Sequence, residues 1–423
     1  MSRPSLTSLS SVSSSPLRIG LMGFGCVGQG LYDILQQLPG FGAEVRRIAV
    51  KNPTKTRSLP ADRFEYHADA LLDDPELDVL VEVIDDAAEA FRLVKAALQQ
   101  GRRVVTANKA MLARHLPELV QLQDEFGGTL LYEAAVCGSI PILRTLDAHF
   151  GSEPLRSVSG ILNGSSNYVL TRMTQEGTDY AAALAEAQLL GFAETDPTLD
   201  MAAFDPRSKA VILAAHAYGL FLKPEQVLHL GIEGITPTDI AYAKAQGLKI
   251  KVVATLEQLP DGRVTALVAP TFVAESSPLY TVEHEFNGVI LEAAFAGTQF
   301  LRGRGAGGHP TGSAVLADLA ALRQKRAYTY TKLRQPAAAF TTDLAVEIYL
   351  RSPSESIRED LALTDISLEG TGPDGYFAVG FTTLARLLKQ REKLREAGAL
   401  VVRTGPISAL QEARHSAQEA LAQ

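Results

Sequence analysis

The sequence predicts an α/β protein: an N-terminal doubly wound parallel sheet of the Rossmann type, a second α+β domain and a small C-terminal α+β appendage. Three observations lead to this prediction. The 423 residues exceed the usual size of a single domain by about two- to threefold. Between Leu17 and Tyr132, short apolar runs alternate with helical ones, which is typical of βαβ units. A glycine-rich turn, Gly23-x-Gly25-x-x-Gly28, joins the first apolar run to the first helical run.

The composition excludes several classes of protein. The chain has 40 basic and 48 acidic residues, a net charge of −8, so we expect neither nucleic acid nor an anionic membrane as a partner. The longest nearly apolar run, residues 211–222, is too short for a membrane helix, which needs about 20 residues. Cys26 and Cys137 are the two cysteines, too few for a disulfide scaffold or a multi-cysteine zinc site. These features favour a cytoplasmic protein.

The first domain is expected over residues 17–140, after a serine-rich leader. Residues 1–16 hold one charge, Arg3, and lack an apolar signal core. We expect a disordered leader there, with an organelle transit peptide as the alternative. The expected strands are 17–22, 45–50, 79–84, 103–106 and 129–132, and the expected helices are 29–37, 87–99 and 116–125.

The pattern changes near Pro141, where a substrate-binding and dimerisation domain is expected over residues 141–302. A helix beginning at Pro206 would have Asp205 as its N-cap. Residues 303–335 form a glycine-rich loop and a helix, from about Thr311, that returns to the first domain. Residues 340–423 form an appendage of unknown role. The other expected elements are strands 157–162, 249–254, 264–270, 288–292 and 344–351, and helix 179–190.

The glycine turn predicts a dinucleotide site because it lies between a strand and a helix. Its glycines permit the tight turn and the close approach of a pyrophosphate, while the helix N-terminus supplies N–H groups. The alternative is a glycine-rich turn without a ligand. The second strand ends in Lys51-Asn52-Pro53-Thr54-Lys55, where an NAD site has an acid. Basic residues there suit a 2′-phosphate and favour NADP, with NAD possible; the alternative is a solvated cationic loop.

A block of carboxylates and a lysine supplies the candidate functional residues of the second domain. Glu194, Asp196, Asp200 and Asp205 precede Lys209, which opens an otherwise apolar helix. Asp205 and Lys209 are spaced i, i+4 and can pair. Carboxylates could bind a substrate ammonium, and the lysine could exchange a proton with a carbonyl or alcohol oxygen. The alternative is a structural salt-bridge cluster.

Lys109 follows the strand 103–106, in Thr106-Ala107-Asn108-Lys109. The carboxyl ends of parallel strands face the ligand crevice, so this lysine is placed to reach a substrate or the nicotinamide ribose. A surface lysine at a helix start is the alternative.

Together, these motifs resemble the homoserine dehydrogenase family, over about 300 residues from Ile19 to Leu319. The resemblance rests on the glycine turn and on residues 105–109 (VTANK), 132–141 (YEAAVCGSIP), 160–168 (GILNGSSNY), 191–209 and 303–311 (GRGAGGHPT).

The resemblance implies an activity and roles for the residues. The family interconverts L-aspartate 4-semialdehyde and L-homoserine with NAD(P)H, on the route to threonine, methionine and isoleucine. Lys209 is then the expected acid/base and Lys109 a second active-site lysine that contacts the cofactor. Glu194 and Asp205 would bind the substrate, and Asp200 would support the lysine.

The resemblance also implies ligands and a partner. The expected cofactor-binding residues are Gly23, Phe24, Gly25, Cys26, Val27, Gly28, Lys51, Thr106, Lys109 and Gly307. A monovalent cation, expected to be sodium, would be held largely through backbone oxygens of Glu133, Val136, Gly138 and Ile140; oxygen ligands suit a hard cation. A homodimer or homotetramer is expected.

The chain departs from the family pattern in three places, and two alternative functions stay open. Asp85-Asp86 replaces the usual Gly-Gly, Ala203 a glycine and Arg304 a proline. One alternative is an acylating aldehyde dehydrogenase with Cys137 as nucleophile and His149 as base. The other is a non-catalytic redox sensor, which would have no use for the block from Glu194 to Lys209.

Overall fold

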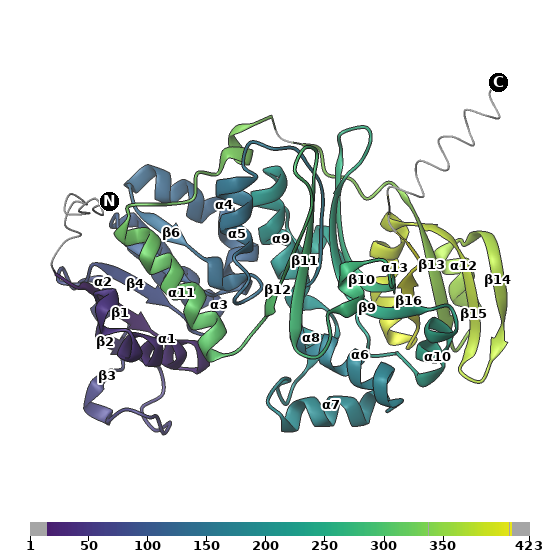
Figure 1. The fold of residues 1–423 in the computed structure, drawn as a ribbon, viewed down its shortest axis with the longest axis horizontal. Coiled ribbons are helices and arrows are strands. Elements are labelled where there is room, and N and C mark those ends of the chain that lie inside the picture. Colours follow the sequence, from purple (N-terminus) through teal and green to yellow (C-terminus); the bar gives the residue numbers. More distant parts are fainter. Residues whose placement is uncertain (1–14, 337, 406, 408–423) are drawn as a thin grey trace, which may run out of the picture.

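The structure is a computed structural model, and it describes residues 15–336, 338–405 and 407 (Figure 1). Most of the expected leader and the last part of the expected appendage lie outside the described residues. Among the described helices, none combines the length and the apolar character needed to cross a bilayer.

A six-stranded parallel sheet forms the first region, in the order β3-β2-β1-β4-β5-β6. This confirms the predicted Rossmann-type sheet. The strand order reverses between β1 and β4, which creates the crevice where α/β proteins bind ligands. The strands are β1 (Leu17–Met22), β2 (Ala43–Ala49), β3 (Phe64–Glu65), β4 (Val79–Glu82), β5 (Arg103–Thr106) and β6 (Thr129–Leu131).

The helices of this region are α1 (Cys26–Gln37), α2 (Asp69–Leu72), α3 (Ala87–Gln99) and α4 (Lys109–Phe126). The prediction that a helix begins at Leu116 was wrong. The Asn108 side chain accepts the Met111 N–H at 3.0 Å and so caps α4 two turns earlier. Lys109 is therefore the first residue of a helix, directly after the end of β5.

One further helix, α11 (Gly308–Arg323), lies across this region and against α1 (Figure 1). A Cβ atom on Gly30 would lie 2.2 Å from the Gly308 carbonyl oxygen, and one on Gly312 would lie 2.8 Å from the Leu31 nitrogen. No side chain fits at these positions, so the two helices touch through their backbones. The segment between β6 and α11 thus leaves the first region and comes back to it.

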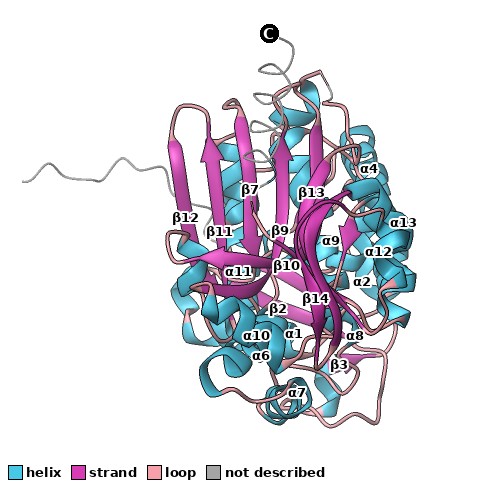
Figure 2. Cartoon of the chain, turned by 90° about the vertical axis from the view of Figure 1, so that its right-hand side faces the viewer, coloured by secondary structure: helices cyan, strands magenta, loops and turns pink. Residues whose placement is uncertain are grey.

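The second sheet has ten strands, in the order β12-β11-β7-β9-β10-β16-β13-β15-β14, with β8 paired to β10. Figure 2 views it with β12, β11, β7 and β9 side by side. Gly303 and Arg304, expected in a glycine-rich loop, are the last residues of β12, which was not predicted. The first strands are β7 (Leu155–Ile161), β8 (Leu228–His229), β9 (Leu248–Gln258), β10 (Val264–Ala274), β11 (Phe286–Ala293) and β12 (Gly297–Arg304).

The helices beside this sheet are α5 (Ile142–Arg144), α6 (Gly164–Glu176), α7 (Tyr180–Leu189), α8 (Thr198–Met201), α9 (Phe204–Tyr218) and α10 (Pro237–Ala245). The prediction that Asp205 caps the helix at Pro206 was wrong. Helix α9 begins at Phe204, and Ala203 occupies the N-cap in the left-handed conformation. Asp205 lies in the first turn, where its carboxylate contacts other side chains.

The C-terminal strands continue the same sheet. The elements β13 (Ala345–Ser352), α12 (Ser356–Leu361), β14 (Thr364–Gly372), β15 (Gly375–Thr383), α13 (Leu384–Glu396) and β16 (Leu400–Arg403) follow in a βαββαβ order. β16 pairs with β13 and also touches β10, where Arg403 lies opposite Thr271. This C-terminal module therefore adjoins the strands that support α9.

Candidate active site

The three glycines of the turn after β1 have three different roles. Gly23 has a φ of +101°, and a Cβ atom there would lie 2.7 Å from the Val83 carbonyl oxygen. A Cβ atom on Gly28 would lie 2.4 Å from the Gly23 carbonyl oxygen. No described atom lies within 4 Å of a Cβ built on Gly25, the residue that precedes α1. Gly23 and Gly28 close the turn, and Gly25 leaves open space in front of the helix, which fits a pyrophosphate.

The other residues of the turn differ in exposure. Phe24 is buried and makes edge contacts with Phe64 and Tyr32, so it supports the turn from within. Cys26 is exposed and Val27 half-buried.

The N-terminus of α11 lies beside the same turn. Gly307 precedes this helix with a φ of +109°. A Cβ atom on Gly308 would lie 2.7 Å from the Cys26 carbonyl oxygen. Two helix N-termini therefore meet at the predicted cofactor turn, and Gly307 is brought to it from far along the sequence.

Lys51 follows β2 and is almost fully exposed. Its Nζ is 4.0 Å from Asp86 Oδ2, and its side chain is 92% exposed. Asp86 also accepts the N–H groups of Ala88 and Glu89, both at 3.1 Å, and so caps α3. This helix cap is the local role of Asp86, at a position where the resemblance predicts a glycine. Arg57 lies over the Phe64 ring, 5.2 Å from its centroid.

A buried carboxylate links the ends of β4 and β5. Thr106 Oγ1 donates to Glu82 Oε2, and the Ile84 N–H donates to Glu82 Oε1 at 2.8 Å. The Asn108 N–H in turn donates to Thr106 Oγ1 at 3.0 Å. Burial raises the pKa of Glu82 to about 7. Sequence reasoning assigned Thr106 to the cofactor and missed Glu82, although an acid at the end of an apolar strand was a visible signal.

Asp205 forms ion pairs with both lysines that were expected at the active site. Lys209 Nζ lies 2.7 Å from Asp205 Oδ2, and Lys109 Nζ lies 3.1 Å from Asp205 Oδ1. Lys209 also donates to the Leu162 carbonyl oxygen at 2.7 Å. Only 8% of the Lys209 side chain is exposed, against 44% for Lys109. The i, i+4 pair expected from the sequence is present, and the structure adds a lysine from the cofactor-binding region to the same carboxylate.

Asn163, the residue before α6, joins Asp205 to Asp200. Its Nδ2 donates to Asp200 Oδ1 at 2.7 Å and to Asp205 Oδ2 at 2.9 Å. Its Oδ1 accepts the N–H and the hydroxyl of Ser166, both at 2.8 Å. These partners fix the orientation of the amide, because a flipped amide would turn its oxygen toward two carboxylates. Sequence reasoning quoted Asn163 only within a motif and gave it no role.

The charged groups in this cluster shift one another's pKa values. Burial opposes ionisation of Asp205, but Lys209, Lys109 and Asn163 together hold its pKa well below the usual range. The pKa of Lys109 is raised, chiefly by the charge of Asp205. The pKa of Asp200 is also raised, by burial and then by the charge of Asp205. At neutral pH Asp205 is therefore ionised and Lys109 protonated.

Glu194 lies in the segment between α7 and α8 and is exposed. Its backbone carbonyl oxygen accepts a hydrogen bond from Gln188 Nε2 at 2.9 Å. Its charge contributes to the raised pKa of Lys109. Glu194 therefore lies near the lysine cluster without being part of its buried network.

The segment predicted to bind a cation makes a sharp turn between the two sheets. Cys137 and Gly138 are both left-handed, with φ values of 60° and 52°. The Ile140 N–H donates to the Cys137 carbonyl oxygen at 3.0 Å. The Glu133 carboxylate accepts the N–H groups of Leu143 and Arg144, both at 2.8 Å, and burial raises its pKa to about 8. Among the described residues, no three His, Cys, Asp or Glu side chains gather as metal ligands, so a cation here would depend on backbone oxygens.

The remaining departures from the family pattern have local explanations. Ala203 adopts a φ of 63°, the conformation that favours glycine. Arg304 donates its N–H to Ser139 Oγ at 3.0 Å, which a proline could not do.

Cys137 does not fit the role of a nucleophile. Its side chain is fully buried, and burial raises the pKa of its thiol to about 12. A reactive cysteine needs an accessible thiolate. The geometry therefore disfavours the acylating aldehyde dehydrogenase.

Comparison with known proteins gives one consistent result. The family model described as homoserine dehydrogenase matches residues 141–320, and the model of its NAD-binding domain matches residues 23–133. A homoserine dehydrogenase from Synechocystis sp. is 38% identical over 313 residues, 72% of each chain.

Solved structures agree with the sequence relatives. A homoserine dehydrogenase from Thiobacillus denitrificans matches with a TM-score of 0.80 and 28% identity, over 93% of this chain and 99% of that one. A hyperthermophilic archaeal homoserine dehydrogenase mutant, solved in complex with NADPH, matches with a TM-score of 0.63 and 27% identity, over 74% of this chain and 99% of that one.

Proposed function

The chain belongs to the homoserine dehydrogenase family, and we propose that it catalyses the reversible NADPH-dependent reduction of L-aspartate 4-semialdehyde to L-homoserine. The observation that carries this proposal is the shared contact of Lys109 and Lys209 with Asp205. It joins the end of the cofactor-binding sheet to the carboxylate block of the second region. In the cell the reaction would serve threonine, methionine and isoleucine synthesis in the cytoplasm.

The residues at the crevice fit a nicotinamide dinucleotide. The open space at Gly25 and the two helix N-termini would hold the pyrophosphate. Lys51 would favour the 2′-phosphate of NADP, although Asp86 beside it offsets part of its charge. When bound, the cofactor supplies the hydride.

Lys209 is the proposed proton donor. Negative charge develops on the carbonyl oxygen of the aldehyde as it is reduced, and a protonated group must meet that oxygen. An ammonium has three N–H groups. Leu162 and Asp205 accept two from Lys209, which leaves the third for the substrate. In the reverse direction, the neutral amine would take the proton from the alcohol.

Lys109 would have a different task. Its side chain is more exposed and begins a helix of the cofactor-binding region. Its charge holds Asp205 ionised, and we assign it to the cofactor and to the orientation of Asp205.

The carboxylates would bind the substrate ammonium. Glu194 is exposed, and its charge raises the pKa of Lys109, so its carboxylate would be available to a ligand bound beside that lysine. Asp205 would contact the ammonium at the buried end, and Asp200 would support it through Asn163.

A monovalent cation and a second subunit complete the proposal. Backbone oxygens of Glu133, Val136, Gly138 and Ile140 would hold sodium in the turn between the sheets. Carbonyl oxygens are suitable donors for such a hard ion. We further propose that the protein works as a homodimer or homotetramer.

The test is an assay of NADPH oxidation with L-aspartate 4-semialdehyde, repeated with NADH. We expect turnover with both cofactors and a higher kcat/KM with NADPH. Absence of turnover with either cofactor, in a protein with a cooperative thermal unfolding transition, would contradict the proposed activity. A preference for NADH of about tenfold or more, 1.4 kcal/mol, would contradict only the cofactor assignment.

A further inference from the structure

A buried carboxylate at the edge of the first sheet takes no part in the proposed reaction. Glu82 is the last residue of β4, and its side chain is fully buried. It pairs in register with Thr106, the last residue of the neighbouring strand β5. The carboxyl ends of parallel strands face the ligand crevice. Glu82 therefore lies beside the place where the cofactor would bind, but it is covered by the protein.

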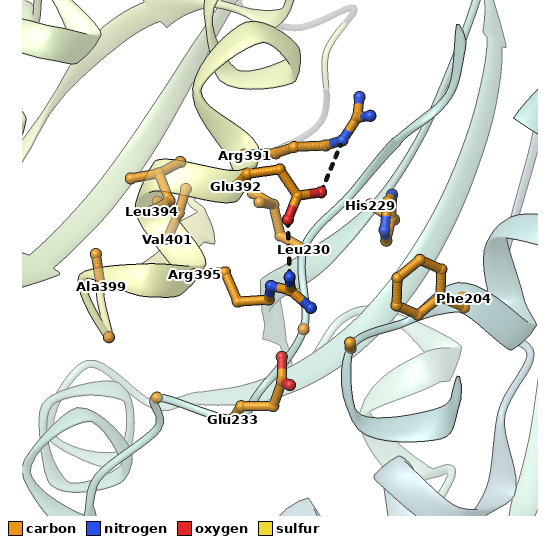
Figure 3. Close-up of a pocket in the computed structure, with 14 residues that line it drawn as sticks. Phe204, His229, Leu230, Glu233, Arg391, Glu392, Leu394, Arg395, Ala399 and Val401 are labelled. Carbon is orange, nitrogen blue, oxygen red and sulfur yellow. Dashed lines mark ion pairs between the residues drawn. The ribbon is translucent and has the colours of Figure 1, made fainter. Parts of the chain in front are cut away.

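Glu82 differs from the other carboxylates of the protein in having no charged partner. Buried carboxylates are ordinarily paired with a cation. Even the exposed Glu392 of the C-terminal module lies between Arg391 and Arg395, with Arg395 Nη2 2.9 Å from its Oε2 (Figure 3). Burial raises the pKa of Glu82, and within residues 15–336, 338–405 and 407 no charged group contributes to that shift. Hydrogen bonds alone therefore hold this carboxylate in place.

Two donors from different segments point at the Glu82 carboxylate. The Ile84 N–H donates to Oε1 at 2.8 Å, and Thr106 Oγ1 donates to Oε2. The carboxylate thus joins the segment after β4 to the end of β5. An amide could not replace it fully, because an amide has one oxygen where a carboxylate has two.

The same network fixes the start of α4. Thr106 Oγ1, whose O–H is donated to Glu82, accepts the Asn108 N–H at 3.0 Å. The Asn108 side chain accepts the Met111 N–H at 3.0 Å, and its Nδ2 donates to the Ile84 carbonyl oxygen at 3.2 Å. The N-cap of α4 is therefore held by a chain of hydrogen bonds that begins at Glu82.

The position of this N-cap matters because Lys109 is the first residue of α4. Lys109 Nζ lies 3.1 Å from Asp205 Oδ1, near the upper end of hydrogen-bond distances. A shift of the helix start by about 1 Å would break this contact, and displacements of that size are large enough to impair an active site. The backbone around Asn108 therefore decides whether Lys109 reaches its partner.

We propose that Glu82 is a positioning residue, which holds Lys109 in contact with the cofactor and with Asp205. The hydrogen bonds of Thr106 and Asn108 transmit its effect. The inference rests on the proposed function, which assigns Lys109 to the cofactor. Glu82 itself would touch neither the substrate nor the cofactor.

The test is a double-mutant cycle on the affinity of the full chain for NADPH, measured by cofactor fluorescence at equilibrium. The variants are Glu82→Gln, Lys109→Met and their combination. We expect Glu82→Gln to weaken NADPH binding by about tenfold, the effect of losing a charged hydrogen bond. Because Glu82 acts through Lys109, the combined variant should bind NADPH like Lys109→Met alone, whereas two independent effects would multiply.

A second pair of variants tests the link through Thr106. Thr106→Val removes the hydroxyl group and keeps the shape of the side chain, while Thr106→Ser keeps the hydroxyl group. Thr106→Val should weaken NADPH binding about as much as Glu82→Gln, and Thr106→Ser should stay within about twofold of the unmodified protein. Neither variant alters Glu82, so this pair decides the question even if Glu82→Gln does not fold.

Two controls separate positioning from a general loss of stability. Asp78 directly precedes β4, at the other end of the strand, and accepts Arg18 Nε at 3.1 Å. Asp78→Asn should lower the temperature of thermal unfolding and leave the NADPH affinity unchanged. Glu392→Gln makes the same chemical change as Glu82→Gln in the distant C-terminal module (Figure 3) and should also leave that affinity unchanged.

Three results would overturn the proposal: an unchanged NADPH affinity in Glu82→Gln, effects of Glu82→Gln and Lys109→Met that multiply, or equal losses in Thr106→Val and Thr106→Ser. Absence of NADPH binding by the unmodified protein would overturn it together with the proposed function. Because the affinity is measured without turnover, these outcomes are distinct from a failure of the reaction, which the assay with L-aspartate 4-semialdehyde detects.

Discussion

The crevice of the first sheet and the lysine–carboxylate cluster are connected through Lys109, yet they are built in opposite ways. The crevice is shaped by backbone: by Gly23 and Gly28, where no side chain fits, and by two helix N-termini. Its charged side chain, Lys51, is almost fully exposed. The cluster is made of buried side chains, in which Asn163, Lys109 and Lys209 share one carboxylate.

This difference sets how each region should respond to substitution. Removing one partner of a buried ion pair leaves an uncompensated charge and costs about 3–5 kcal/mol. An exposed ion pair contributes about 0–1 kcal/mol. We therefore expect large, chemistry-specific effects in the cluster and small, graded effects at the exposed edge of the crevice.

The largest effect is expected for Lys209→Met. Loss of its ammonium should lower kcat by about 10²-fold or more, the scale of general acid–base catalysis. The affinity for NADPH, measured by fluorescence, should stay nearly unchanged because Lys209 belongs to α9. Lys109→Met is the matched variant and should weaken NADPH binding as well. If Lys209→Met kept about a third of the kcat, the proton donor would be Lys109 or water.

The next largest effect is expected for Asn163→Asp. We expect it to lower kcat/KM by about 10-fold or more, because a third carboxylate would face Asp200 and Asp205. Burial and Asp205 already raise the pKa of Asp200, and the new charge would raise it further. If ionised Asp200 is required, activity is lost as pH falls through that pKa, so the acid limb of the profile should move to higher pH.

Asn167→Asp is the control for this prediction. Asn167 lies one turn along the same helix, where its amide donates to the carbonyl oxygens of Val282, His284 and Phe286. That variant should lose stability without moving the acid limb. A pH profile that is the same in Asn163→Asp and the unmodified protein would remove Asn163 from the cluster's electrostatics.

Glu194→Ala should mainly raise KM for L-homoserine, by about 10-fold, since it deletes a charged partner of the substrate ammonium. Glu194 lies outside the buried network, so kcat should change much less. Steady-state kinetics separates the two parameters. An unchanged KM would exclude Glu194 from substrate binding.

Lys51→Asp should change cofactor preference by only a few-fold. The ion pair between Lys51 and Asp86 is exposed, and its Nζ and Oδ2 atoms are 4.0 Å apart. An exposed ion pair contributes about 0–1 kcal/mol. The ratio of kcat/KM for NADPH over NADH should narrow or invert. A change of about 100-fold would mean that Lys51 is held more rigidly on bound cofactor than the free protein indicates.

The smallest effect is expected for Ala203→Gly. Ala203 is left-handed, which costs a residue other than glycine about 1–2 kcal/mol. The added freedom of glycine in the unfolded chain offsets roughly 0.4–1 kcal/mol of this. We expect a free energy of unfolding that is higher by about 0.5 kcal/mol, measured by denaturant titration. A loss of stability would mean that the alanine methyl group contributes packing that outweighs the backbone strain.

The sequence predicted best where local signals were strong. The bounds of α3 and β5 match the prediction, because Asp86 and Gly101 mark where those segments begin and end. Helix α4 was predicted too short because Asn108 had been interpreted as part of a ligand motif rather than as a helix cap. Strand β12 was missed because most of its side chains are exposed and show no inward-facing apolar pattern.

Part of the candidate site was predictable because it also depends on a local signal. The pair Asp205–Lys209 follows from helical spacing alone. The contact between Lys109 and Asp205 depends on how two distant segments are placed, which no local pattern encodes. Asn163 was overlooked because its role depends on two carboxylates, 37 and 42 residues further along the chain, that meet at its amide.

The backbone contact between α1 and α11 has a consequence for the protein during its synthesis. The six-stranded sheet is fully translated once β6 has left the ribosome, but α11 begins only at Gly308. At roughly 5–20 residues per second, translation of the intervening segment takes on the order of ten to forty seconds. Throughout that interval α1 lacks its partner helix, and the surface around Gly30 that α11 covers is exposed. We therefore expect the region of the six-stranded sheet to depend on chaperones until α11 has been synthesised.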